Sequence, residues 1–432
     1  MDDFQRVLVA GTGPTTAQLA VLLGTGRGSA VGIAGRRSAR SAAFFAGLER
    51  AGRTVRVDVQ NEQHRAAAGE HPVAEVFQGY EAVTGRWGAL VLAVTADAYT
   101  PVLDRIDPEV LRGLGCVVLV SPTFGSHALV RGRLRGLGAD AEVISLSSYL
   151  GDTRWSDGAP SPHVLTAGVK KRLYLGSDRG GTPNLELLRE LHRGLGVDPV
   201  AVSGPLEAET RNISLYVHPA LFMNELTLNA VFFETTPVKY VYKLIPEGPV
   251  SPALVNDIVS QWREITAVVA ELGVDGVNLL RFMVDDSYPV RPESISRRDV
   301  ERFEELPPVH QDYLVYVRYA SLLVDPFSEP DADGRYFDFS AIPIRRVFRD
   351  AEGRWEVPRM PKEDYYRTKV VQGVARSLGV PCPTIDGLLA RYEDALTRAA
   401  GLRAGEPLTD AFTVRDFHED LDVIRAELGR TR

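Results

Sequence analysis

The chain has few cysteines and no long apolar run, the features typical of disulfide-rich, zinc-binding and membrane proteins. It contains two cysteines, Cys116 and Cys382, among 432 residues. Two isolated cysteines form neither a disulfide framework nor a zinc site, so we expect no bound metal. No apolar run approaches the roughly 18 residues of a membrane span. These absences favour a cytoplasmic globular protein, for which we expect no signal peptide.

The chain also lacks an excess of positive charge. The 57 Asp and Glu residues outnumber the 49 Lys and Arg residues, and the formal net charge is −8. Because a nucleic-acid-binding surface needs excess cations to neutralise phosphates, this balance argues against nucleic acid as a partner. The length exceeds that of one compact core and indicates two or three domains.

A glycine-rich turn lies close to the N-terminus. Residues 7–10 form a short apolar strand, Gly11-Thr-Gly13-Pro14-Thr15 follows, and a helix-compatible segment begins there. Gly11 allows a tight turn, and Gly13 lets the backbone approach a pyrophosphate, which the N–H groups at the helix N-terminus would bind. The third position of this fingerprint, usually Gly or Ala, is Thr16. The alternative is an ordinary strand–turn–helix, but the position after a strand and before a helix favours dinucleotide binding.

The first 150 residues alternate apolar strands with helical segments, which is typical of a doubly wound parallel sheet. The expected strands are residues 7–10, 30–34, 54–57, 89–94, 116–120 and 141–146. Residues 163–205 add further strands and a helix. We therefore predict an α/β fold with a Rossmann-type dinucleotide-binding domain over residues 1–205. Ligands of such sheets bind beyond the carboxyl ends of the strands, and the residues there that we expect to contact the cofactor are Thr95, Ala96, Asp97, Ser121, Pro122 and Thr123.

Arginines follow the second expected strand. An acidic residue at this place normally binds the ribose hydroxyls of NAD, whereas cations suit a 2′-phosphate. Arg36 is nearest the strand end, and Arg37 and Arg40 follow it. The sequence therefore favours NADPH over NADH, although these arginines also suit a simple solvated helix start.

The pattern becomes mainly helical from about residue 206, so we predict a helical substrate and catalytic domain over residues 206–432. Ser251-Pro252 has the composition of a helix start, apolar residues recur at helical spacing to Leu272, and Gly273 is a stop signal. A Pro/Asp/Gly-rich stretch predicts a hairpin or loop insertion near residues 325–360.

Two segments carry residues suited to acid/base chemistry. His218 lies just past the expected domain junction, where a histidine can exchange protons near neutral pH. Asp152 and Arg154 follow the sixth expected strand. An aspartate there can orient a histidine, and an arginine can hold a carboxylate. A structural histidine and a charged turn remain the alternatives.

Several ordered motifs together resemble the opine metallophore dehydrogenases, the family of staphylopine and pseudopaline dehydrogenases. They include Gly-Thr-Gly-Pro at 11–14, Thr-Ala-Asp-Ala-Tyr at 95–99, Ser-Pro-Thr-Phe-Gly-Ser at 121–126, Tyr-Leu-Gly-Asp-Thr-Arg at 149–154, Gly-Val-Lys-Lys at 168–171, Ala-Glu-Thr-Arg-Asn at 208–212, Leu-Tyr-Val-His-Pro at 215–219, Tyr-Val-Tyr-Lys-Leu at 240–244 and Glu-Asp-Tyr-Tyr-Arg-Thr at 363–368.

This resemblance implies a reaction. A 2-oxo acid condenses with the primary amine of a histidine-derived, nicotianamine-like intermediate, and NADPH reduces the imine to a metal-chelating opine. It also implies catalytic roles for His218 and Asp152, a phosphate contact for Arg36 and a homodimer. We infer Arg154, Arg211 and Tyr216 as substrate contacts.

The residues leave some alternatives open. Pyruvate and 2-oxoglutarate are both possible oxo acids, and neither the configuration of the histidine part nor the metal carried is determined. A nucleotide-binding sensor without turnover and a simple 2-hydroxy-acid or amino-acid dehydrogenase are the competing functions.

Overall fold

The structure, a computed structural model, describes residues 2–287, 294–321 and 340–430. The chain forms two compact units. The first comprises Met1–Asn212 together with Asp422–Arg432, and the second comprises Ile213–Leu421. The division thus falls at 212/213 rather than at the expected 205/206, because helix α7 (Pro205–Thr210) packs on strands of the first unit.

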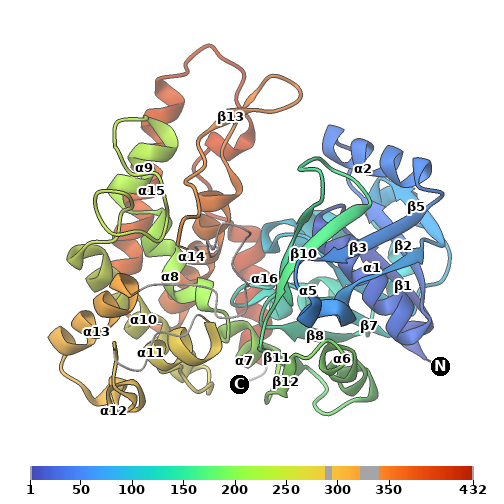
Figure 1. Ribbon diagram of the computed structural model, residues 1–432, viewed down its shortest axis with the longest axis horizontal. Coiled ribbons are helices and arrows are strands. Elements are labelled where there is room, and N and C mark those ends of the chain that lie inside the picture. The colour runs from blue at the N-terminus through green and yellow to red at the C-terminus, as the bar shows by residue number, and fades with distance from the viewer. Residues whose placement is uncertain (1, 288–293, 322–339, 431–432) are drawn as a thin grey trace. The chain divides into compact units, whose positions relative to one another are not determined.

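An eight-stranded sheet forms the core of the first unit, in the order β12-β11-β8-β7-β6-β1-β2-β5 (Figure 1). The six strands from β8 to β5 run parallel, which confirms the predicted Rossmann-type sheet. The central strands are continuous apolar runs buried on both faces. The strands are β1 Arg6–Ala10, β2 Ala30–Gly35, β5 Glu75–Gln78, β6 Ala89–Leu92, β7 Cys116–Leu119, β8 Glu142–Leu146, β11 Arg172–Ser177 and β12 Asp198–Ala201.

The sheet has two features that the sequence did not predict, and one expected strand lies in another sheet. Strand β11 runs antiparallel to β8. Strand β3 (Thr54–Val59) belongs to a second sheet, and its alternating exposed and buried residues are typical of a strand with one solvated face. The neighbour of β2 is instead the short edge strand β5, whose one buried side chain, Phe77, leaves almost no pattern in the sequence.

Helix α1 (Pro14–Arg27) lies between the two sheets of the first unit. The second sheet has the order β4-β3-β10-β9 and contacts α1 through all four strands. Its remaining strands are β4 Gly69–Pro72, β9 Gly151–Trp155 and β10 His163–Val169. The other helices of this unit are α2 Ala39–Arg50, α3 Tyr99–Leu103, α4 Pro108–Arg112, α5 Ser126–Gly136 and α6 Pro183–Arg193.

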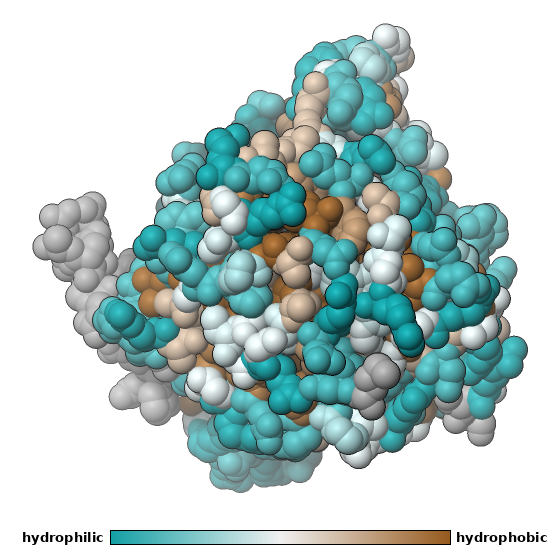
Figure 2. Space-filling model, turned by 90° about the vertical axis from the view of Figure 1, so that its right-hand side faces the viewer, coloured by the Kyte–Doolittle hydropathy of each residue, from teal (hydrophilic) through white to brown (hydrophobic). Residues whose placement is uncertain are grey.

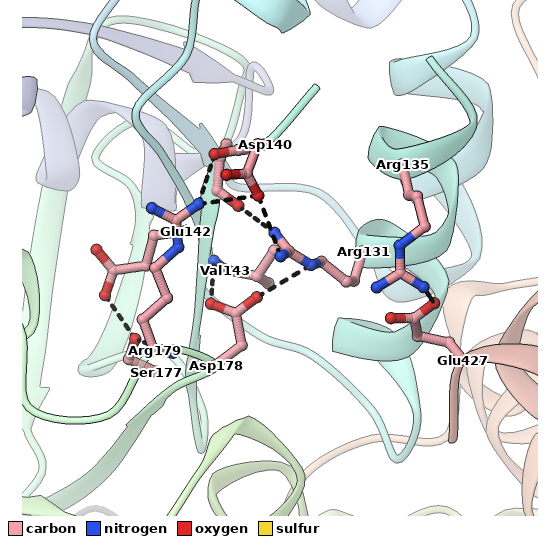
Figure 3. Close-up of polar contacts among 10 residues, drawn as sticks. Arg131, Arg135, Asp140, Glu142, Val143, Ser177, Asp178, Arg179 and Glu427 are labelled. Carbon is pink, nitrogen blue, oxygen red and sulfur yellow. Dashed lines mark hydrogen bonds and ion pairs between the residues drawn. The ribbon is translucent and has the colours of Figure 1, made fainter. Parts of the chain in front are cut away.

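The C-terminal residues return to the first unit. In helix α16 (His418–Arg430), Glu427 accepts a hydrogen bond of 2.5 Å from Arg135 of α5 (Figure 3). Gly132 of α5 faces Val423, and a Cβ on Gly132 would lie 2.4 Å from a Val423 methyl. Close helix contact at a glycine therefore joins the C-terminus to the dinucleotide-binding fold, which the expected domain limits missed.

The second unit is mainly helical, as predicted. Helix α10 begins where expected, with Ser251 accepting a 3.2 Å hydrogen bond from Leu254 N. The helices are α8 Ile213–Phe222, α9 Glu225–Phe232, α10 Pro252–Glu271, α11 Leu279–Arg281, α12 Arg297–Glu301, α13 Pro308–Ala320, α14 Arg359–Leu378 and α15 Pro383–Gly401. Part of the predicted insertion, residues 325–339, lies outside the described residues, but a small hairpin of β13 (Phe348–Arg349) and β14 (Trp355–Glu356) falls within it.

The surface and the apolar interior agree with the composition. On the face drawn in Figure 2, polar residues cover most of the surface and apolar residues show between them near its centre. Cys116 and Cys382 are buried, and burial raises the pKa of the Cys116 thiol. Among the described helices, none is long and apolar enough to cross a membrane.

Candidate active site

The glycine turn has the shape that a bound dinucleotide requires. Gly11 has φ of +141°, and a Cβ there would lie 2.6 Å from the carbonyl oxygen of Ala93, so only glycine fits. Gly13 precedes α1, and no atom lies within 4 Å of the place its Cβ would take. Open space therefore adjoins the amino end of a 14-residue helix, where Pro14 and Thr15 form the first turn. This cradle fits a pyrophosphate.

Thr16 is compatible with the turn despite replacing a small residue. Its side chain is fully buried, and its hydroxyl oxygen lies 3.0 Å from the Cβ position of Gly11. The threonine thus fills the contact between helix and turn that Gly or Ala makes elsewhere.

The arginines after β2 differ in their surroundings. Arg36, Arg37 and Arg40 are all exposed. Arg37 Nε lies 2.6 Å from a carboxylate oxygen of Glu81, and this pairing lowers the pKa of Glu81. Arg36 forms no ion pair with any described residue. It is therefore the arginine whose charge is most available for a 2′-phosphate.

The loops after β6 and β7 lie at the same edge of the sheet as the glycine turn. Thr95 precedes a short 3₁₀ turn containing Ala96 and Asp97. After β7, Ser121 and Pro122 lead to Thr123, whose N–H donates to Ser126 Oγ over 2.9 Å. The parallel register of β1, β6 and β7 brings these loops together, as the sequence predicted.

A buried carboxylate that sequence reasoning missed fixes the loop after β7. Glu209 of α7 accepts hydrogen bonds from Gly125 N (2.9 Å), His127 N (2.7 Å) and Ser145 Oγ (2.9 Å). It thereby satisfies N–H groups at the start of α5, where a negative charge is favoured. Only the folded chain brings this residue, 82 positions away from His127, to that helix end.

Asp152 and Arg154 lie on β9 of the second sheet, not in a turn beyond the sixth strand. Both are exposed. Arg154 donates a 2.9 Å hydrogen bond to Gln60 Oε1 rather than pairing with Asp152. The strand escaped prediction because its residues are polar and alternate in exposure.

A partly buried chain of hydroxyl groups links β9 to α1. The Tyr149 and Thr153 hydroxyls lie 2.6 Å apart, those of Thr153 and Thr166 lie 2.8 Å apart, and Thr166 donates to Gln18 Oε1 over 2.5 Å. The Gln18 amide nitrogen donates to Ala67 O, which fixes the amide orientation. Thr166 must therefore accept from Thr153, and Thr153 from Tyr149. The strand that carries Asp152 is thus linked to the helix of the glycine turn.

In the second unit, His218 lies on α8 next to a proline. Pro219 has no N–H, so the carbonyl of Leu215 lacks its helical partner. The buried Gln261 side chain of α10 donates to that carbonyl over 2.9 Å. This bond holds α8 on α10 and fixes the backbone at His218.

The imidazole of His218 contacts a hydroxyl and a carboxylate. Its Nε2 lies 3.0 Å from the Tyr242 hydroxyl, and its Nδ1 lies 3.6 Å from Asp364 Oδ1. The ring packs edge to face on Phe222, and the side chain is 16% exposed. The distance to Asp364 exceeds that of a hydrogen bond. One ring nitrogen therefore faces a hydroxyl and the other faces a carboxylate.

Asp364 lies within a buried charged cluster on α14. It is fully buried, and Arg367 Nη1 lies 3.1 Å from its Oδ1. Arg367 also contacts Glu363 over 3.0 Å. His218 and Arg367 thus approach the same carboxylate oxygen, and the arginine partly compensates the cost of burying that negative charge. No local spacing in residues 363–368 points to a histidine partner for Asp364, so the sequence alone does not predict this pair.

The two remaining predicted substrate contacts differ. Tyr216 has no exposed surface and packs edge to face on Phe282, so its ring is part of the core of the second unit. Arg211 is paired with Glu207 at 3.0 Å in the first unit.

The chain is similar to known proteins over nearly its whole length. The family described as staphylopine dehydrogenase matches residues 5–428. Staphylopine synthase of Staphylococcus aureus is 40% identical over 430 residues, covering 99% of both chains. Pseudopaline synthase of Pseudomonas aeruginosa is 39% identical over 396 residues, covering 91% of this chain and 90% of the other.

Solved structures of opine dehydrogenases are also similar to this chain. Yersinopine dehydrogenase with NADP+ bound has a TM-score of 0.92 and 31% identity, with 100% of each chain covered. An octopine dehydrogenase complex with NADH and L-arginine has a TM-score of 0.59 at 17% identity, covers 97% of this chain and 95% of the other, and shares the fold. The extent of these matches confirms the resemblance seen in the motifs: this chain belongs to the staphylopine dehydrogenase family of opine dehydrogenases.

Proposed function

We propose that this protein is an NADPH-dependent opine dehydrogenase that forms a metal-chelating opine. It condenses a 2-oxo acid, pyruvate or 2-oxoglutarate, with the primary amine of a histidine-derived, nicotianamine-like intermediate and reduces the resulting imine. The observation that carries the proposal is the His218–Asp364 pair in a chain that also has the dinucleotide turn. Similarity to staphylopine and pseudopaline synthases over nearly the whole chain supports the substrate class.

NADPH would be held by the first unit. The turn at Gly11, Gly13, Pro14 and Thr15 would bind the pyrophosphate, with Arg36 on the 2′-phosphate and Arg37 and Arg40 nearby. The loops at 95–97 and 121–123 would position the nicotinamide. When bound, this cofactor supplies the hydride. The NADP+-bound yersinopine dehydrogenase supports the choice of nucleotide.

The second unit would supply the proton transfers. His218 Nε2 gives and takes the proton as the amine condenses and the imine is reduced, while Asp364 keeps Nδ1 protonated and stabilises the charged ring. Tyr242 donates its hydroxyl hydrogen to Nε2 while the ring is neutral. Asp152 stays a proposed proton-transfer partner in the first unit. Arg154 remains a proposed carboxylate contact.

The proposal is tested by following NADPH oxidation at 340 nm. We expect turnover to require both an oxo acid and an amine, and mass spectrometry to identify a secondary-amine product. NADPH oxidation with oxo acid alone indicates a simple hydroxy-acid dehydrogenase. Tight NADPH binding without turnover on any pair indicates a sensor.

We also propose a cytoplasmic protein, as the composition favours, and a homodimer, as the family resemblance implies. Light scattering on the purified protein tests the dimer directly.

A further inference from the structure

A lysine at the end of β10 is held across the connection between β8 and β9. The backbone N–H of Lys170 donates to Leu150 O over 2.8 Å. Its ammonium group donates to Ser148 Oγ over 2.5 Å. Two contacts from one residue thus fix this side chain against residues 148–150.

This connection adjoins the edge of the main sheet that we assign to the cofactor. Tyr149 N donates to Ser121 Oγ over 3.2 Å, and Ser121 follows β7. On the other side, Ser147 exchanges hydrogen bonds of 2.8 and 3.1 Å with Tyr174 of β11. The hydroxyl of Ser148 and the ammonium of Lys170 therefore lie beside a loop expected to contact the nicotinamide, all within the first unit.

The charge of Lys170 has no counterpart in the described part of the chain. None of the described carboxylates lies within ion-pair distance, and its hydrogen-bond partner, Ser148, is neutral. The side chain remains accessible to solvent, yet protein atoms around the ammonium lower its pKa to about 8, and no charged side chain contributes to this shift. A partly desolvated, unpaired cation costs free energy unless an anion compensates it, and such groups concentrate at functional sites.

Of the other cations considered for substrate binding, Arg211 is paired with Glu207, and Arg154 donates one hydrogen bond to the neutral Gln60. Lys170 differs from Arg154 in that its hydroxyl partner has a hydrogen of its own to donate. Ser148 Oγ accepts from the ammonium, so its own hydrogen remains available to donate. Both groups present donors that a single carboxylate can accept.

We infer that Lys170 and Ser148 form a subsite for a substrate carboxylate. The inference rests on the proposed function, in which both the oxo acid and the amine carry carboxylates. The variant shows which substrate supplies this carboxylate. A rise in the KM of the oxo acid indicates the oxo acid, and a rise in the KM of the amine indicates the amine.

The experiment compares Lys170→Gln and Lys170→Arg with Lys171→Gln as the matched neighbour. We expect K170Q to raise the KM of one substrate about 10-fold or more, the loss expected for a charge-assisted hydrogen bond. The affinity for NADPH, measured by fluorescence titration, stays as in the parent protein. K171Q leaves all constants unchanged, and K170R retains most of the affinity.

The pH profile separates a charge from a packing role. In the parent protein, kcat/KM for the affected substrate falls above about pH 8, where Lys170 loses its proton. In K170R this loss disappears, because arginine stays protonated. An alkaline limb that is identical in the two proteins would overturn the subsite.

Failure of the subsite and failure of the proposed function are distinguishable. If the parent protein turns over an oxo acid and amine but K170Q keeps both KM values, the subsite is wrong and the function stands. If the parent protein turns over nothing, calorimetric titration of the NADP+-loaded protein with pyruvate and with 2-oxoglutarate tests the subsite. Binding that K170Q loses supports the subsite, and no binding, or equal binding by K170Q, rejects it.

Discussion

At the scale of single residues, the carboxylate beside His218 is Asp364. The family resemblance pointed to Asp152, which lies on an exposed strand position in the first unit. Asp364 is 146 positions after His218 in the sequence, and only helix packing brings its Oδ1 to 3.6 Å from Nδ1.

The first prediction concerns Asp364→Asn. We expect kcat to fall about 10-fold or more, toward the 10²–10⁴-fold that a general acid/base contributes, because the ring loses the charge that stabilises its protonated form. The pH profile of kcat should shift as well. Asp416→Asn is the matched control, since Asp416 forms an exposed pair with His418 over 2.8 Å. An unchanged pH profile in D364N would contradict the role of Asp364 as a positioning residue.

A second residue-scale prediction concerns cofactor choice. Arg36→Ala should raise the KM for NADPH about 10-fold or more while changing the KM for NADH little, because only NADPH carries the 2′-phosphate. Arg37→Ala provides the comparison, since Arg37 is already paired with Glu81. Equal effects of R36A on the two nucleotides would remove Arg36 from the phosphate site.

At the scale of elements, the hydroxyl chain from Tyr149 to Gln18 holds a strand and a helix together. The two threonine hydroxyls each accept one hydrogen bond and donate another, Tyr149 donates at the start of the chain, and the Gln18 amide sets the direction of every bond. Such a chain is stabilising only when complete. Tyr149 is therefore a neutral donor that points inward, and burial raises its pKa further.

Thr166→Val tests this chain. The variant keeps the shape of the side chain but leaves Gln18 Oε1 without this donor and the Thr153 hydroxyl hydrogen without an acceptor, so we expect a loss of about 1–3 kcal/mol in the free energy of unfolding. Urea denaturation measures it. Thr25→Val on α1, the helix that carries Gln18, is the control, because the Thr25 hydroxyl donates only to the carbonyl of Val21. Equal losses in the two variants would show that the chain adds nothing.

At the scale of the whole molecule, the polypeptide forms the first unit, passes into the second and returns. The returning helix is joined to α5 by the Arg135–Glu427 pair (Figure 3) and by the close approach of Val423 to Gly132. Truncation after residue 421 therefore removes part of the dinucleotide-binding unit, although the removed segment follows the second unit in the sequence.

Global stability should depend on pH through His192. This residue is buried on α6 with Nδ1 2.7 Å from Leu188 O, and burial lowers its pKa. A histidine with a lowered pKa stabilises the folded state above the unfolded pKa of about 6.5, and that contribution is lost as pH falls below it.

We therefore expect the free energy of unfolding to fall between pH 7.5 and pH 5, with His192 contributing up to about 1.36 kcal/mol per pH unit. Urea titrations of His192→Gln should show a shallower dependence over this range. His418→Gln, at an exposed site, should match the parent protein. A steeper dependence in H192Q than in the parent would reverse the assigned sign.

Neighbouring residues account for several features of this fold. The glycine turn, the continuous apolar strands and the caps of α2 and α10 follow from neighbouring residues, because sterics, burial and N-terminal N–H groups act over a few positions. The ordered motifs, taken together, were enough to identify the family. The tertiary structure alone decided which distant groups meet. The pairing of β2 with β5, of Glu209 with α5 and of His218 with Asp364 joins residues far apart in sequence. No local pattern around these residues indicates their partners, so the partners are known only once the folded elements pack together.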